Sequence, residues 1–200
     1  MRSISTLPLI YFVRHGQTDW NVENRLQGQA ETDINPTGRA QATENGKTLK
    51  GLISDPADFD FVASPSRRTR ETMERIRTAM GLEPQAYRTD PRLLELHFGD
   101  WQGFTYDELE LREPGSKARR SVDKWNFRPP GAAAESYEML KKRVSSWLSD
   151  VTRPTVCVTH GGIFRAVFRL AADLPQKKAA VLAVPQDRIL RLEKGELEWV

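Results

Sequence analysis

Two stretches far apart in the chain share one pattern, an apolar run that ends in His-Gly. They are residues 9–16 and residues 155–161. Each has the length and content of a buried strand bounded by a turn. In an open α/β sheet, ligand-binding groups gather at the carboxyl ends of the strands. We therefore predict that the two strands lie side by side and bring His15 and His160 to one site.

The rest of the chain alternates between helical and strand patterns. A helix is predicted over about 36–50, with Gly51 as the stop. A second helix is predicted to follow Ser64-Pro65-Ser66 and to end at Gly81. Three more are predicted over about 105–113, 134–150 and 162–172. Short strands are predicted over about 59–63, 85–88, 179–184 and 188–192. This alternation predicts a three-layer α/β/α sandwich with a mostly parallel central sheet. We expect a single domain over residues 1–200, with a lid or insertion at about 104–133.

The composition excludes several classes of protein. The single cysteine, Cys157, rules out an intramolecular disulfide framework. No stretch is long enough for a membrane span or a signal peptide, so we expect a cytoplasmic protein with no membrane partner. The formal net charge of +3 favours anionic ligands weakly. No basic run is interleaved with aromatic residues, so no nucleic-acid partner is expected. The oligomeric state cannot be predicted from this sequence.

Five motifs follow one another in a fixed order. They are Arg14-His15-Gly16 with Thr18, Asn21 and Gln27-Gly28; Ser64-Pro65 with Arg68 and Thr72; Glu95 with Gly99, Trp101 and Gly103; Gly131 with Glu135-Ser136; and Thr159-His160-Gly161-Gly162. Together they resemble the histidine phosphatase (phosphoglycerate mutase-like) superfamily, in its phosphatase branch. The resemblance covers about residues 9–185 and implies a phosphoglycerate mutase-like fold.

The charged members of these motifs suit a phosphoryl group. Arg14 and Arg68 can each offer two planar donors to phosphate oxygens, and His160 can add another. Arg68 is chosen over its neighbour Arg67 because of its place in the motif. The first N–H groups of the helix that Gly161 opens also favour an anion. The resemblance implies that Asn21 helps to bind the phosphate. It also implies that Gln27 and Gly28 lie on the loop that meets the substrate.

The expected chemistry runs through a covalent intermediate on His15. A neutral imidazole nitrogen attacks phosphorus, while a backbone acceptor near Gly16 holds the other ring nitrogen. The resemblance implies that Glu95 protonates the leaving alcohol and then activates water. No metal and no other cofactor is expected, because the sequence holds no carboxylate cluster with ligand spacing.

The sequence favours a phosphomonoester hydrolase that acts on a small anionic phosphate ester. In the mutases that this chain resembles, a Trp is followed by two arginines before Pro-Pro. Here Asn126 and Phe127 follow Trp125, so the two arginines of the mutase pattern are missing. Two alternatives stay open: a phosphoglycerate mutase-type phosphoryl transferase, and an inactive phosphate-binding module. The basic side chains of the lid indicate either a second anionic group on the substrate or a solvated charged face. They are Lys117, Arg119, Arg120, Lys124 and Arg128.

Overall fold

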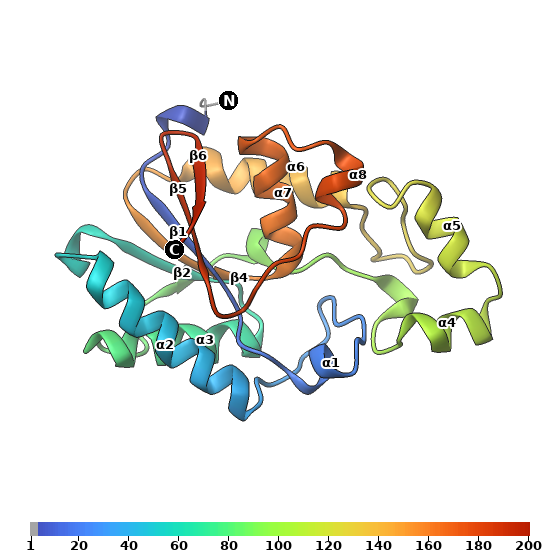
Figure 1. The fold of residues 1–200 in the computed structure, drawn as a ribbon, viewed down its shortest axis with the longest axis horizontal. Helices are drawn as coiled ribbons and strands as arrows, with labels where there is room; N and C mark the ends of the chain where they lie inside the picture. Colours follow the sequence, from blue (N-terminus) through green and yellow to red (C-terminus); the bar gives the residue numbers. More distant parts are fainter. Residues whose placement is uncertain (1–3) are drawn as a thin grey trace.

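A computed structural model describes residues 4–200 and shows a six-stranded mixed sheet (Figure 1). The strands are β1 (Ile10–Arg14), β2 (Asp60–Ala63), β3 (Arg88–Thr89), β4 (Thr155–Thr159), β5 (Ile189–Glu193) and β6 (Glu196–Trp199). Their order is β3-β2-β4-β1-β5-β6. The pairs β3–β2, β2–β4 and β4–β1 are parallel, and β5 and β6 run antiparallel to their neighbours. Strands β1 and β4 are therefore neighbours, as predicted, and Arg14 lies opposite Thr159.

Helices cover both faces of the sheet. They are α1 (Asp19–Val22), α2 (Pro36–Leu52), α3 (Arg67–Met80), α4 (Tyr106–Arg112), α5 (Ser116–Val122), α6 (Tyr137–Asp150), α7 (Gly161–Ala171) and α8 (Gln176–Ala179). Helices α2 and α3 pack on one face, and α6 and α7 on the other (Figure 1). In β1, Ile10 and Phe12 enter the core under α6 and α7, whereas Tyr11 and Val13 enter the core under α2 and α3. This confirms the predicted three-layer sandwich.

Most helix boundaries follow from local capping. Helix α2 begins as predicted, with Asn35 capping the N–H of Gly38 and Pro36 at the first position. Gly81 ends α3 in the left-handed conformation, with φ of 83°. The expected stop at Gly51 is wrong, because α2 continues to Leu52. A glycine ends a helix where the chain turns left-handed, and Gly51 keeps a helical backbone instead.

The carboxyl-terminal part of the sheet differs from the prediction. Residues 179–184, expected as a strand, form the end of α8 and an irregular segment. Their apolar side chains still reach the core, since Ala179, Ala180 and Val184 are buried beside α7. The final strands are β5 and β6, joined at Lys194 and Gly195, which both have positive φ. The apolar content of residues 179–184 therefore predicted their burial correctly, but it did not predict whether they form a strand.

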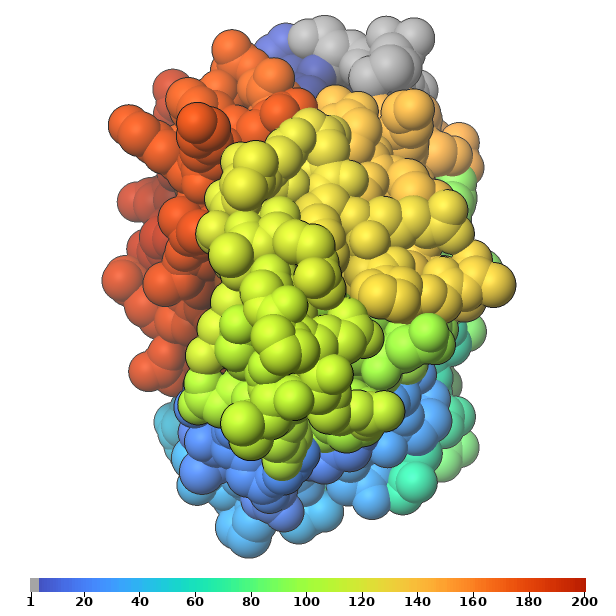
Figure 2. Space-filling model, turned by 90° about the vertical axis from the view of Figure 1, so that its right-hand side faces the viewer, coloured from blue at the N-terminus to red at the C-terminus, as the bar shows by residue number. Residues whose placement is uncertain are grey.

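Helices α4 and α5 lie at one end of the molecule, away from the sheet (Figure 1). Figure 2 looks onto that end, where residues 100–125 lie against the segment that carries α8. No helix within residues 4–200 combines the length and apolar content that a membrane span requires.

Candidate active site

The two histidines meet at the carboxyl edge of β1 and β4. The N–H of His15 donates to the carbonyl of Thr159 at 2.9 Å, which ties the end of one strand to the other. The ring centroids of His15 and His160 are 5.3 Å apart, with the rings at 60°. Both side chains are buried. The prediction that adjacent strands bring these imidazoles together is confirmed.

Hydrogen bonding and burial define the state of the His15 ring. Its Nδ1 lies 2.8 Å from the carbonyl oxygen of Gly16. A carbonyl only accepts, so Nδ1 carries the proton and Nε2 keeps a lone pair. Burial, followed by the positive charges of Arg68 and Arg14, lowers the pKa of His15 well below its usual value. The ring is therefore neutral at pH 7 and can act as a nucleophile.

The loop after β1 needs two glycines to pack on α2. A Cβ on Gly16 would lie 2.3 Å from the carbonyl oxygen of Gly38, and a Cβ on Gly38 would lie 2.2 Å from that of Gln17. The N–H of Gly16 also donates to Thr72 Oγ1 of α3 at 3.0 Å. Because both close contacts are with backbone, any larger residue would push the His15 loop away from its support.

Gln186 also holds the His15 loop, although no sequence motif indicated it. Its Nε2 donates to the carbonyl of His15 at 2.9 Å and to Asn21 Oδ1 at 3.1 Å. It follows the irregular segment before β5, so only the folded chain brings it to the site. The same segment supplies the carbonyl of Val184, which accepts from Arg14 Nη1 at 2.6 Å.

Arg68 is held inside the site, whereas Arg67 points away from it. The Nη1 and Nη2 atoms of Arg68 donate to the carbonyls of Ala30 at 2.7 Å and Gly28 at 2.6 Å. Arg67 is exposed and pairs with Asp33 at 2.6 Å. The choice of Arg68 by motif therefore agrees with its burial. Burial lowers the pKa of Arg68 to about 10, which leaves the guanidinium charged at pH 7.

Among the buried side-chain nitrogens of residues 4–200 that lack a hydrogen-bond partner, three belong to this centre: Nε of Arg14, Nε of Arg68 and Nδ1 of His160. The Ser64 hydroxyl lies 2.8 Å from Nε2 of His160 and can donate to it, which leaves Nδ1–H as a donor. A buried donor without an acceptor costs about 1–3 kcal/mol. Three such donors around His15 indicate a site built to receive the oxygens of an anion.

The other predicted binding residues line the loops beside this centre. Asn21 Oδ1 accepts a hydrogen bond from the N–H of Thr18 at 3.1 Å. Its Nδ2 has no acceptor within the described residues. Gln27 is buried and its Oε1 accepts from Thr32 at 2.8 Å. Gly28, with φ of 54°, turns its carbonyl toward Arg68. Thus Gln27 and Gly28 shape the site through the loop, and Asn21 keeps a free donor.

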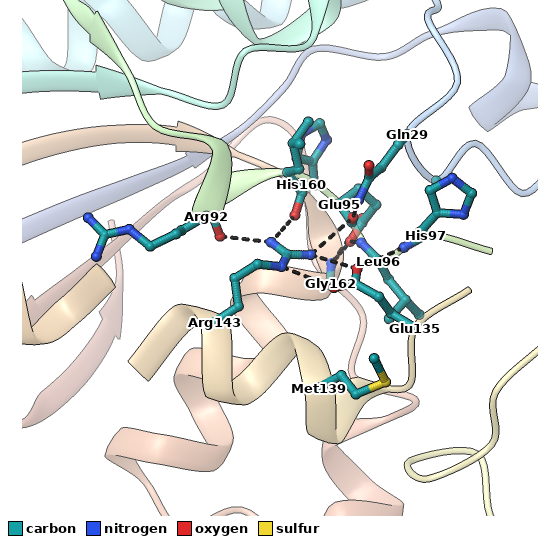
Figure 3. Close-up of polar contacts among 12 residues, drawn as sticks. Gln29, Arg92, Glu95, Leu96, His97, Glu135, Met139, Arg143, His160 and Gly162 are labelled. Carbon is teal, nitrogen blue, oxygen red and sulfur yellow. Dashed lines mark hydrogen bonds and ion pairs between the residues drawn. The ribbon is translucent and has the colours of Figure 1, made fainter. Parts of the chain in front are cut away.

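The carboxylate of Glu95 lies at the N-terminus of α7. The N–H of Gly162 lies 3.1 Å from each oxygen of the Glu95 carboxylate, and the N–H of Leu96 donates to Oε1 at 2.8 Å (Figure 3). A Cβ on Gly162 would lie 2.1 Å from Oε1. Of the first N–H groups of α7, which were expected to favour an anion, that of Gly162 donates to the Glu95 carboxylate. Gly161 is the first residue of α7, where no helical carbonyl can accept its N–H.

Arg143 of α6 fixes the segment that carries Glu95. Its Nη1 donates to the carbonyls of Arg92 and Leu94, both at 2.8 Å, and its Nη2 pairs with Glu135 at 2.8 Å (Figure 3). Arg143 also donates to the Glu95 carbonyl at 3.3 Å. No sequence motif indicated Arg143. A signal was present, because an arginine three residues after a core leucine falls on the apolar face of α6.

Two alternatives, a metal site and a mutase-type substrate site, concern residues near this centre. Within residues 4–200, no three histidine, cysteine, aspartate or glutamate side chains converge as metal ligands would. The segment that would carry the mutase arginines supplies apolar packing instead. Trp125 is buried, and Phe127 lies with its ring centroid 5.2 Å from that of Trp101. His97 has a structural contact, since its Nδ1 accepts from the N–H of Gly99 at 2.9 Å.

The fold and the site define an anion-binding centre built on two histidines at the carboxyl edge of an α/β/α sandwich. The family model of the histidine phosphatase superfamily (branch 1) matches residues 10–200. The chain belongs to this superfamily.

Among curated proteins, the chain is 34% identical over 177 residues to a glucosyl-3-phosphoglycerate phosphatase of Mycobacterium tuberculosis, a match that covers 83% of this chain and 76% of the relative. It is 31% identical over 196 residues to phosphoglycerate mutase-like protein 4 of Arabidopsis thaliana, covering 95% of this chain and 81% of that protein. Among solved structures, a mycobacterial glucosyl-3-phosphoglycerate phosphatase in complex with VO3 superposes with a TM-score of 0.75 at 28% identity, covering 96% of both chains.

Proposed function

We propose that this chain is a metal-independent phosphomonoester hydrolase that works through a phosphohistidine on His15. The observation that carries the proposal is the neutral His15 ring, with Nε2 free, beside three buried donors that lack a partner. A phosphate ester would give each donor an acceptor and present its phosphorus to Nε2. Transfer of a phosphoryl group depends mainly on positioning and charge stabilisation, which this arrangement supplies.

The reaction takes two balanced steps. In the first, the Nε2 lone pair of His15 forms the N–P bond as the ester P–O bond breaks, and the leaving alkoxide takes a proton from Glu95. In the second, Glu95 takes a proton from water as the water oxygen attacks phosphorus, and the N–P bond returns its electrons to His15. The products are an alcohol and inorganic phosphate, and Glu95 is protonated again.

Arg14, Arg68 and His160 hold the non-bridging oxygens of the phosphoryl group through both steps. Their charges and donors stabilise the negative charge that builds up on those oxygens. The N–H of Gly161 and the Nδ2 of Asn21 add two neutral donors at the edge. Gln27 and Gly28 keep the loop in place on which the ester group would lie.

Hydrolysis is favoured over a mutase reaction by the segment from Trp125 to Phe127. A mutase must hold its organic product while the phosphoryl group stays on histidine. This segment places aromatic packing where the mutase pattern places two arginines. The phosphatase relatives in sequence and in structure support the same choice.

The test is hydrolysis of p-nitrophenyl phosphate in EDTA between pH 4 and 9, with acid-labile labelling of the protein by a phosphate donor. We expect activity in EDTA, and a loss of about 10³-fold or more in His15→Ala together with loss of the label. Arg68→Ala should also be severely impaired, and its exposed neighbour Arg67→Ala provides the matched control. Activity that disappears in EDTA, or that survives in His15→Ala, contradicts the proposal.

A further inference from the structure

A basic cavity, separate from the His15 centre, lies between the lid and the segment that follows α7. It has a volume of about 460 Å³ and is lined by Tyr106, Lys117, Arg120, Ser121, Lys124 and Val181. Figure 2 shows the two chain segments that form it in contact. The size falls within the range of small-molecule pockets, about 300–1,000 Å³.

Two of the five basic lid side chains have no hydrogen-bond or ion-pair partner among residues 4–200. Arg119 pairs with Glu113 at 3.2 Å, and Lys117 pairs with Asp107. Arg128 donates to the carbonyls of Ala132 and Ala134. The sequence alone could not separate these local partners from free cations. The remaining two lid cations are Arg120 and Lys124.

Arg120 is 7% exposed, yet no carboxylate within residues 4–200 forms an ion pair with it. Its guanidinium lies 5.2 Å from the ring centroid of Tyr106 and 5.8 Å from that of Phe98. Such cation–π contacts hold the group in place without neutralising it. The positive charge of Arg120 therefore stays available to a ligand in the cavity.

Lys124 is half-buried, and no acceptor for its ammonium group exists within the described part of the chain. Burial lowers the pKa of Lys124 to about 8, with further lowering by Arg120 and Arg165. A cation that is held partly out of water beside other cations is stabilised electrostatically when an anion binds next to it. The cavity is thus lined by two positive charges that no side chain among residues 4–200 pairs.

Arg165 of α7 connects this cavity to the histidine centre. Its Nη1 donates to the Tyr137 hydroxyl at 3.1 Å and its Nε to the carbonyl of Leu182 at 3.1 Å. A Cβ on Gly161 would lie 3.7 Å from Arg165 Nη1 and 3.8 Å from Arg14 Nε, so both guanidinium groups lie beside Gly161, on the side that its missing side chain leaves open. Positive charge therefore continues from the His15 site, through Arg165, to Lys124 and Arg120.

We infer that Arg120, Lys124 and Arg165 form a second anion site, which takes a carboxylate or a second phosphate of the substrate whose phosphoryl group lies at His15. The inference rests on the proposed hydrolase function and narrows its substrate class to phosphate esters with a second anionic group. Lys124 and Arg120 bind the far end of such a substrate, and Arg165 bridges the two ends. An ester without a second anion leaves the cavity cations unpaired and binds more weakly.

The experiment measures competitive inhibition of p-nitrophenyl phosphate hydrolysis, so that no probe needs to be a substrate. The probes are 3-phosphoglycerate, fructose 1,6-bisphosphate and glycerol 3-phosphate, which carry a carboxylate, a second phosphate and no second anion. We expect at least one of the first two to bind the wild type roughly 10-fold to 100-fold more tightly than glycerol 3-phosphate. The tighter of the two identifies the anion.

Lys124→Met and Arg120→Met should remove most of that difference and leave the kcat/KM for p-nitrophenyl phosphate within about twofold. Arg119→Met is the matched control and should preserve the difference. The inference is overturned if the wild type binds all three probes equally, or if the lid variants bind as the wild type does. A wild type without turnover contradicts the proposed function instead. The second site is then tested by calorimetric titration with the same probes.

A pH series gives an independent readout. The other titratable groups that face Lys124 are Lys117 and Arg120 on α5, Tyr106 on α4 and Arg165 on α7. Burial raises the pKa of Tyr106 to about 12, so its phenol stays neutral through this series. Above pH 8 the ammonium of free Lys124 loses its proton, so the inhibition constant of the probe that carries the second anionic group should rise there in the wild type. In Lys124→Met this rise should be absent.

Discussion

The lack of a side chain at Gly162 determines where the Glu95 carboxylate lies. With any larger residue, the Cβ would overlap Oε1, and the carboxylate would have to leave the N–H that now holds it. The carboxylate is the free end of a side chain and can move aside, but the Cβ would also lie 2.9 Å from Cδ2 of the buried Leu140. A substitution here therefore displaces the proposed acid and also presses on the core, so urea unfolding has to accompany the kinetics.

Gly162→Ala should lower kcat about 10²-fold, which is the usual contribution of a general acid or base. The loss should be larger for alkyl phosphates than for p-nitrophenyl phosphate, whose leaving group needs no proton. Gly51→Ala, on the open face of α2 with no atom near its Cβ, is the matched control and should keep full activity. Equal kcat values for Gly162→Ala and the wild type would show that Glu95 does not need this N–H.

Arg68 also acts on His15 through its charge. It is the second largest cause, after burial, of the lowered pKa of His15. Removing the charge in Arg68→Met should raise the pKa of His15, so the acid limb of the kcat/KM profile should move to higher pH. Arg68→Lys keeps a charge but loses the planar donors, so its rate should fall without that movement.

The comparison uses one substrate throughout, so that the ionisation of the substrate itself cancels. A profile for Arg68→Met that falls at the same pH as the wild type would contradict the electrostatic role.

At the scale of elements, α6 supports the segment that delivers Glu95. Five acceptor oxygens, three carbonyls of that segment and both carboxylate oxygens of Glu135, converge on the guanidinium of Arg143 (Figure 3). Arg143→Met should destabilise the protein by about 2 kcal/mol, because buried carbonyls lose their donor. It should also lower kcat more than it changes KM, since the acid is displaced while the phosphate donors stay.

Arg143→Lys should rescue little, because a single ammonium group cannot reach all of these acceptors. Lys142→Met, one residue earlier on the exposed face of α6, is the control for urea unfolding and steady-state kinetics. A kcat unchanged in Arg143→Met would mean that Glu95 is positioned without it.

How far the sequence predicted each element depended on local signals. The strands before His15 and His160 carry both apolar periodicity and a turn, and both are present where predicted. Residues 179–184 carry apolar content alone, which burial in either a strand or a loop can explain, and the prediction there was wrong. Motif spacing likewise selected Arg14, Arg68 and Glu95. Gln186 and Arg143 act through backbone carbonyls of distant segments, a role that no local pattern reports.

At the scale of the whole molecule, two buried neutral imidazoles make stability depend on pH. Burial is the largest cause that keeps the pKa of His15 and of His160 well below 6.5 in the folded state. The unfolded chain therefore takes up two protons below pH 6.5 that the folded protein does not. The contribution of these two histidines is constant above that pH, and it falls as the pH drops, by up to about 2.7 kcal/mol per pH unit.

Urea unfolding between pH 6.5 and 5 measures this slope before most carboxylates titrate. His160→Asn should reduce the slope to about half. A stability that stays flat over this range would show that the buried histidines can be protonated without unfolding.

We propose that residues 1–200 form one domain, with the segment at about 104–133 acting as a lid over the site. Trp101, just before the lid, and Trp125, within it, belong to the same core as α6 and α7. Calorimetry should therefore show a single transition. A separate low-temperature transition, absent after deletion of α4 and α5, would mark the lid as an independent unit.

The place of β1 in the sheet has a consequence for synthesis of the protein. This strand is made first of the six, but both of its partners, β4 and β5, come from the last quarter of the chain. At about 5–20 residues per second, a ribosome needs roughly 7–28 s to translate the intervening segment. During that time neither edge of the apolar strand β1 has a partner strand, and we expect a chaperone to bind this part of the nascent chain until β4 is made.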